Sequence, residues 1–136
     1  MSATAADSLD AADNATDTEA TRYEKAFRET RRVLDESIES LMIFEEFEDN
    51  RDKRDQIRLD RRTLETERSN LVRANIAFHT GKATMNPPSP KLVSEILALS
   101  KKAVELTVER TTAAAVLKLA TSALTKFGEI QQIGKG

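Results

Sequence analysis

The chain has 136 residues, of which 39% are hydrophobic and 32% charged, a composition typical of one globular helical domain rather than a disordered chain. Its net charge of −2 gives no general attraction for nucleic acid or an anionic membrane. Cysteine is absent, which excludes disulfides, thiolate nucleophiles and cysteine-based metal sites. Only four Gly and three Pro interrupt the chain, so long helices are expected.

Residues 1–17 are small and acidic, with four Asp and no basic residue. So little apolar surface cannot offset the entropy lost on ordering, and we expect a flexible, disordered acidic tail that aids solubility. The segment lacks both the basic and the apolar part of a secretory signal, and no apolar run in the chain is long enough to span a membrane. We expect a cytoplasmic protein with no membrane insertion; export without a cleavable signal is the alternative.

The first predicted helix covers residues 21–48. Thr21 and Glu24 have the spacing of a capping box, in which each side chain accepts a hydrogen bond from a free backbone N–H at the start of the helix. Apolar residues then recur at alternating four- and three-residue steps and form one face, which includes Tyr23, Phe27, Leu34, Leu41 and Phe44.

The second predicted helix covers residues 51–80. Four apolar residues repeat every seven positions, but Asp60 and Glu67 interrupt the seam and make it narrow; the four are Ile57, Leu64, Leu71 and Phe78. Continuing the seam of the first helix reaches acidic residues, so we expect a turn at residues 48–51. The alternative is a single helix over residues 21–80 with a stutter.

The third predicted helix covers residues 90–127, with Ser89 as its N-cap and Gly128 after its end. Its four-three alternation of seam positions is unbroken, and further apolar residues lie off that seam. A helix that is apolar nearly all round must be buried on several sides, and two neighbours cannot cover it. We therefore expect a partner to contact this helix, with scattered apolar exposure as the alternative. The candidate interaction residues are Leu97, Val104, Val108, Arg110, Val116 and Leu119.

Arg110 is the charged member of that set and falls on the seam of the third helix. An unpaired buried charge costs several kcal/mol, so either its stem packs and its head reaches solvent, or it forms an ion pair that sets helix register.

Two oppositely charged segments adjoin the predicted turn. Residues 35–49 are acidic with no basic residue, and residues 51–73 carry eight Lys and Arg against five acids. Folded as a hairpin the segments would neutralise each other, and a binding patch is the alternative. The charged candidates are Glu45, Glu46, Glu48, Asp49, Arg54, Arg58, Arg61 and Arg62.

Enzymatic signatures are missing from the sequence. His79 is the only histidine, so histidine-based zinc sites and paired Glu-x-x-His di-iron sites cannot be built within one chain. We expect no cofactor, no metal site and no catalytic residue.

Together these features predict an all-α protein: an antiparallel three-helix bundle or coiled-coil-like helical hairpin, with one domain over residues 18–128 and flexible tails at 1–17 and 129–136. The expected function is that of a non-enzymatic interaction protein, such as an adaptor, small chaperone, regulator or assembly subunit, acting through its long C-terminal helix. Its partner would be another protein or a second copy. A nucleic-acid-associated regulator using the Arg-rich second helix is the alternative, although interleaved acids oppose phosphate binding. A structural or exported self-assembling helical protein is a further alternative.

Overall fold

The structure is a computed structural model that describes residues 18–106 and 108–131. It contains four α-helices and a short 3-10 turn, and no strand occurs in this part of the chain; the elements are α2 (Glu19–Phe47), α3 (Arg51–His79), α4 (Pro90–Glu105), η1 (Val108–Arg110) and α5 (Ala113–Gln131). The all-α expectation is confirmed. The predicted tail at 1–17 and residues 132–136 of the other lie outside the described residues, whereas residues 129–131 belong to α5.

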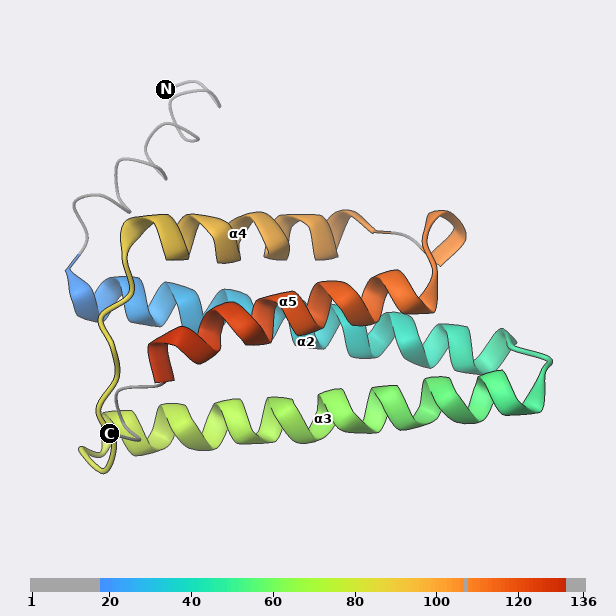
Figure 1. The fold of residues 1–136 in the computed structure, drawn as a ribbon, viewed down its shortest axis with the longest axis horizontal. Helices are drawn as coiled ribbons and strands as arrows, with labels where there is room; N and C mark the ends of the chain where they lie inside the picture. The colour runs from blue at the N-terminus through green and yellow to red at the C-terminus, as the bar shows by residue number, and fades with distance from the viewer. Residues whose placement is uncertain (1–17, 107, 132–136) are drawn as a thin grey trace, which may run out of the picture.

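The four helices run up, down, up and down, and α2 lies at their centre (Figure 1). It packs against α3 on one side and against α4 and α5 on the other, whereas α3 touches α5 only slightly. The buried residues of α2 cover about half of its circumference, because Ala26, Glu29 and Ile38 are buried besides the predicted seam. The helix that neighbours cover on several sides is therefore α2, and not the third predicted helix.

The start of α2 lies two residues before its predicted position. The hydroxyl of Thr18 accepts a hydrogen bond from the backbone N–H of Thr21 over 3.2 Å, so Thr18 is the N-cap. Thr18 and Thr21 both carry the hydroxyl that an N-cap needs, and Thr18 is the one that caps the helix.

The turn between α2 and α3 forms where the sequence predicted it, at residues 48–50. Asn50 caps α3 by accepting from the N–H of Lys53 over 3.0 Å, and its own N–H donates to Oε2 of Glu48 over 3.1 Å. The alternative of one helix over residues 21–80 is therefore wrong.

The predicted single helix over residues 90–127 is also wrong. The helix that begins at Pro90 ends at Glu105, and a second helix begins at Ala113. The hydroxyl of Thr112 accepts a hydrogen bond from the N–H of Ala115 over 3.1 Å at the start of this second helix. The chain reverses here, so α4 and α5 pack against each other and against α2. Folding back allows each half to bury apolar residues of the other, which a single rod cannot do. Val116 and Leu119, expected to face a partner, lie in the core for this reason.

The connection between α3 and α4 closes the opposite end of the bundle. Asn86 donates its backbone N–H to the carbonyl of Ile130 over 2.7 Å and its side-chain amide to the carbonyl of Glu129 over 2.8 Å. Nε of Arg22 donates to the carbonyl of Pro88 over 2.8 Å. These bonds hold the start of α2 and the end of α5 to one loop.

One polar pair lies inside the contact between α2 and α4. The hydroxyl of Ser100 donates to Oε1 of Glu29 over 2.8 Å, and both side chains are buried. Arg32 lies 3.6 Å from the same carboxylate and supplies a positive charge at its edge. The buried acid is thereby satisfied by neighbours. None of the described helices is long and apolar enough to cross a membrane.

Candidate functional site

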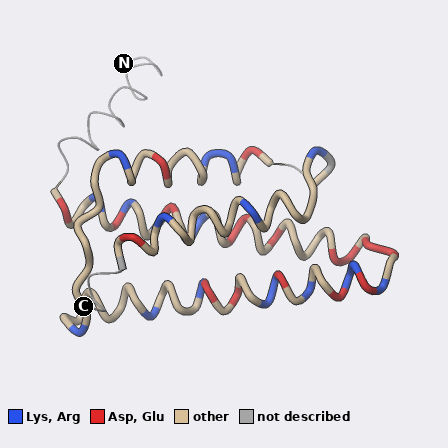
Figure 2. The backbone as a smooth tube through the Cα atoms, in the orientation of Figure 1, with Lys and Arg blue, Asp and Glu red and all other residues tan. Residues whose placement is uncertain are grey.

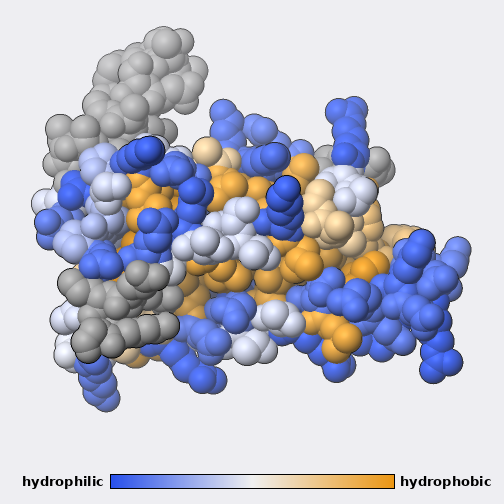
Figure 3. Space-filling view, viewed as in Figure 1, coloured by the Kyte–Doolittle hydropathy of each residue, from blue (hydrophilic) through white to orange (hydrophobic). Residues whose placement is uncertain are grey.

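The hairpin of α2 and α3 extends past η1 (Figure 1), so α2 and α3 are each other's main neighbours there, and the connection from α4 to η1 borders the last turns of α2. We call residues 41–61 the hairpin end. Acidic and basic positions concentrate there, as Figure 2 shows. Hydrophilic side chains cover most of this end in the view of Figure 3, with small hydrophobic areas between them.

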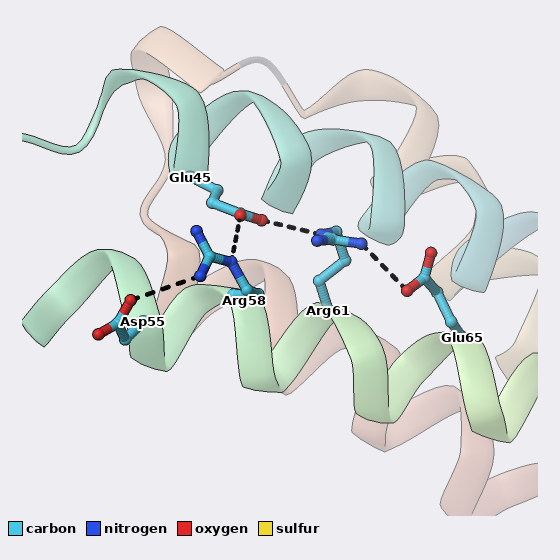
Figure 4. Close-up of polar contacts among 5 residues, drawn as sticks. All are labelled: Glu45, Asp55, Arg58, Arg61 and Glu65. Carbon is cyan, nitrogen blue, oxygen red and sulfur yellow. Dashed lines mark hydrogen bonds and ion pairs between the residues drawn. The ribbon is translucent and has the colours of Figure 1, made fainter. Parts of the chain in front are cut away.

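A network of ion pairs joins the two helices of the hairpin end (Figure 4). Glu45 on α2 accepts from Nε of Arg58 over 2.8 Å and from Nε of Arg61 over 2.9 Å, one bond on each carboxylate oxygen. Arg61 also donates to Glu65 over 3.1 Å, and Arg58 lies 3.6 Å from Asp55. Opposite charges at the helix ends thus pair within the molecule.

The network perturbs the ionisation of its central carboxylate. Hydrogen bonds from Arg58 and then from Arg61 hold the pKa of Glu45 below its usual range, and the bond to Glu45 raises the pKa of Arg58. The side chains of Glu45 and Arg61 are 16% and 17% exposed, and that of Arg58 is 40% exposed. Solvent screens the Arg58 pair more, so Arg61 contributes more to stability.

The other predicted charged residues are differently placed. Glu48 accepts the turn hydrogen bond described above. Glu46, Asp49, Arg54 and Arg62 make no ion pair with a residue that the structure describes. A pair farther along the hairpin joins Arg68 to Asp35 over 2.8 Å, and both side chains are partly exposed. The pairing expectation therefore fits Glu45, Arg58 and Arg61, while the exposed charges are free to meet solvent.

An apolar groove runs beside the hairpin end, between the second half of α2 and the connection from α4 to η1. We call it the α2 groove; its lining residues are Glu36, Glu39, Ser40, Ile43, Phe47, Leu106 and Val108. Ile43, Leu106 and Val108 are half-buried and form its apolar part. Phe47 is 75% exposed, the highest value among the exposed large hydrophobic residues of the described chain.

The pattern of seam positions did not predict the groove, because the apolar residues of α2 that line it lie beside the seam and not on it. Met42 and Ile43 lie beside the seam residues of α2, and Met42 is 52% exposed. The run from Leu41 to Phe44, followed by Phe47, is apolar around more of the helix than one neighbour can cover. That excess was a usable signal, since it lies just before the predicted turn.

The six candidate interaction residues do not form one surface. Val116 and Leu119 are buried between α5 and the rest of the bundle. Leu97 and Val108 are half-buried, and Val104 and Arg110 are exposed. Arg110 lies in η1 rather than in a helical seam, and it is exposed. Of the six, Val108 alone lines the α2 groove.

A second surface hollow follows α5 and is lined by Ala114, Leu117, Lys118, Thr121, Ser122, Thr125 and Lys126. All of these residues belong to one helix, and most are small or polar. Such a surface resembles an ordinary solvated helix face. The α2 groove is the better candidate because two segments form it and a large aromatic side chain stands exposed at its edge.

Within residues 18–106 and 108–131 no group of three or more His, Asp or Glu side chains is arranged to hold a metal ion. The histidine, His79, lies 2.5 Å from Oε1 of Glu24 at the far end of the bundle from the groove. Comparison with protein-family models, curated proteins and solved structures finds no match for this chain.

Proposed function

We propose that this is a non-enzymatic interaction protein that binds a protein partner through the α2 groove and the exposed face of Phe47. The observation that carries the proposal is the exposure of Phe47 beside the half-buried Ile43, Leu106 and Val108. Exposed aromatic side chains that adjoin an apolar groove are the usual anchors of protein interfaces. In this proposal the binding surface is the α2 groove and not a long C-terminal helix.

The expected energy is modest and measurable. Full burial of a Phe side chain is worth about 1.5–3 kcal/mol, and most of Phe47 is still exposed, so its burial by a partner would contribute roughly 1–2 kcal/mol. The half-buried groove residues would add to this. Such a contact supports a regulated or transient complex more readily than an obligate one.

The nucleic-acid alternative has weaker support. It depends on the arginines of α3, of which Arg58, Arg61 and Arg68 are each engaged by a carboxylate of α2. Binding phosphate through those three would require breaking their ion pairs, which leaves, of the candidate arginines, Arg54 and Arg62, which pair with no described residue. Self-assembly is a variant of the proposed function in which the partner is a second copy.

The test compares two exposed apolar residues, one at the groove and one away from it. Phe47→Ser removes the anchor, and Ile76→Ser removes a side chain that is 56% exposed near the other end of α3, outside the groove. Tagged forms of the full chain and both variants are used to capture partners, and light scattering over a range of concentrations gives their mass. We expect a bound protein, or a second copy, to be retained by the full chain and Ile76→Ser and lost with Phe47→Ser.

Equal capture by all three proteins would place any interaction outside the groove. A monomer at every concentration that captures nothing would contradict the proposed function altogether.

A further inference from the structure

We propose that the α2 groove binds an amphipathic helix whose apolar face is flanked by Lys and Arg. This inference rests on the proposed function and names the chemistry of the partner. It is carried by the combination of an apolar groove and two acidic residues that line it, Glu36 and Glu39, which we call the acidic wall.

The shape of the groove suits a helix. The residues of α2 that line it recur at three and four positions, from Glu36 through Glu39, Ser40 and Ile43 to Phe47, and so lie on one face. They span roughly 16 Å along the helix axis, which is about three helical turns. A partner helix could lie along this length with its apolar side against Ile43 and Phe47, as in other helix-in-groove complexes.

The charge of the groove selects a basic flank. Glu36 and Glu39 line it, and neither makes an ion pair with a described residue. From residue 33 to residue 50 the chain contains no Lys or Arg. The last turn of α2 carries no basic residue either, so the partial negative charge at its C-terminus adds to that of the carboxylates. Cations along the partner would meet this potential directly.

The N-terminal segment of this chain fits the groove poorly. Residues 1–17 carry four Asp and no basic residue, so the acidic wall would repel them.

A second copy is also a poor occupant. If two copies met through the same groove, Glu36 and Glu39 of both copies would be enclosed in one contact. The groove has no basic residue among its lining to pair with these four carboxylates, so enclosing them would be costly. A separate basic helix is the occupant that removes both the exposed apolar surface and the excess negative charge.

The test uses two labelled peptides of about 18 residues, long enough to be helical in water. Both carry Leu at the same positions of one face; one has Lys and the other Glu at the flanking positions. Fluorescence anisotropy measures binding to the full chain at low and high salt. We expect the Lys peptide to bind, its affinity to fall as salt rises, and the Glu peptide to bind at least about tenfold more weakly.

Variants locate the site. Phe47→Ser should weaken binding of the Lys peptide by about tenfold, and Ile76→Ser should not change it. The double variant Glu36→Gln with Glu39→Gln should reduce the affinity and flatten its salt dependence. The control is Glu46→Gln with Asp49→Asn, which removes the same charge from exposed positions outside the groove. It should bind as the full chain does.

Equal affinity for the two peptides, or equal loss with the two double variants, would overturn the basic-helix inference. A mass that rises with concentration and falls with Phe47→Ser would overturn it in favour of a second copy. Failure of the proposed function can be told apart from these two outcomes. It would appear in the capture experiment with tagged protein, as partner binding that does not depend on Phe47.

Discussion

Tyr23 on α2 donates a hydrogen bond from its hydroxyl to Oδ1 of Asn75 on α3 over 3.0 Å. Its ring lies 4.4 Å from that of Phe78 and 6.0 Å from that of Phe127, centroid to centroid, and only 2% of the residue is exposed. One side chain therefore joins the start of the first helix to the ends of two others. Burial, with a smaller effect from Glu24, raises the pKa of Tyr23 to about 12.

The first prediction concerns alkaline stability. Below the ordinary pKa of 10, Tyr23 is neutral in both the folded and the unfolded chain and does not affect stability through ionisation. As the pH rises from 10 to about 12, the unfolded chain loses the proton first, so the free energy of unfolding falls by about 2–3 kcal/mol. Tyr23→Phe should remove this component from the pH dependence.

Ultraviolet absorbance of the phenolate checks it directly, because the chain contains one Tyr and no Trp. Native protein should titrate late and together with unfolding, and protein in urea should titrate at the ordinary value. A native titration at the ordinary pKa would contradict the burial of the ring.

The second prediction concerns the ion-pair network of the hairpin end. Glu45→Gln leaves Arg61, which is 17% exposed, without its main carboxylate and should lower the free energy of unfolding by about 1–2 kcal/mol. Glu46→Gln, one position along and exposed, should change it by less than about 0.5 kcal/mol. Urea unfolding at neutral pH measures both. Equal effects would mean that the Glu45 pairs contribute no more than any surface charge.

The third prediction gives the pH dependence of that network. The pKa of Glu45 is lowered in the folded state, so its contribution is complete above the unfolded value of 4.5 and is lost as the pH falls through the lower folded pKa. The stability difference between the full chain and Glu45→Gln should therefore persist at neutral pH and shrink in acid below 4.5. A difference that stays constant into strong acid would show that ionisation of Glu45 is not its source.

The fourth prediction concerns the clamp on the end of α5. Asn86→Ala removes the 2.8 Å side-chain bond to the carbonyl of Glu129 and leaves the backbone bond to Ile130 in place. We expect the last turn of α5 to open more often, with amide hydrogen exchange there faster by about fivefold, equivalent to about 1 kcal/mol. Thr84→Ala, an exposed change in the same loop, is the control and should leave exchange unchanged.

The sequence predicted the first two helices and their turn because local signals there agree. The seam of α2 loses phase at Glu48, and Asn50 is a good N-cap at the same place. The prediction of one helix over residues 90–127 was wrong after Leu106, because a four-three pattern of apolar residues fits one long helix and two short helices that fold back equally well. Arg110 on the seam, with Thr111 and Thr112 after it, was the local sign of a break.

The candidate groove was harder to predict than the helices. It depends on where α4 ends, since Leu106 and Val108 form one side of it. A continuous helix would have carried those residues along the bundle instead of turning them toward Ile43. The sequence therefore indicated the exposed apolar surface at Phe47 only as an excess of hydrophobic residues at the end of α2. It did not indicate the other wall of the groove.

The fifth prediction concerns the break between α4 and α5. One substitution should change the free energy of unfolding in opposite directions for two short helices and for one continuous helix. Thr112→Ala removes the hydroxyl that accepts from the N–H of Ala115, so the loss of the N-cap of α5 should cost about 1 kcal/mol of unfolding free energy. Thr112→Ser keeps an acceptor and should restore most of it. In one continuous helix the same alanine would be stabilising, because Ala has the higher helix propensity.

Thr125 provides the internal control for this comparison. It is exposed within α5, and its hydroxyl bonds back to the carbonyl of Thr121, as threonines do inside helices. Thr125→Ala should therefore stabilise the protein by a few tenths of a kcal/mol on the propensity scale. Urea unfolding of the three variants should give opposite signs for positions 112 and 125. A gain in stability at both positions would mean that the chain does not begin a new helix after residue 112. Without a break between α4 and α5, the α4–η1 connection would not form a wall of the α2 groove.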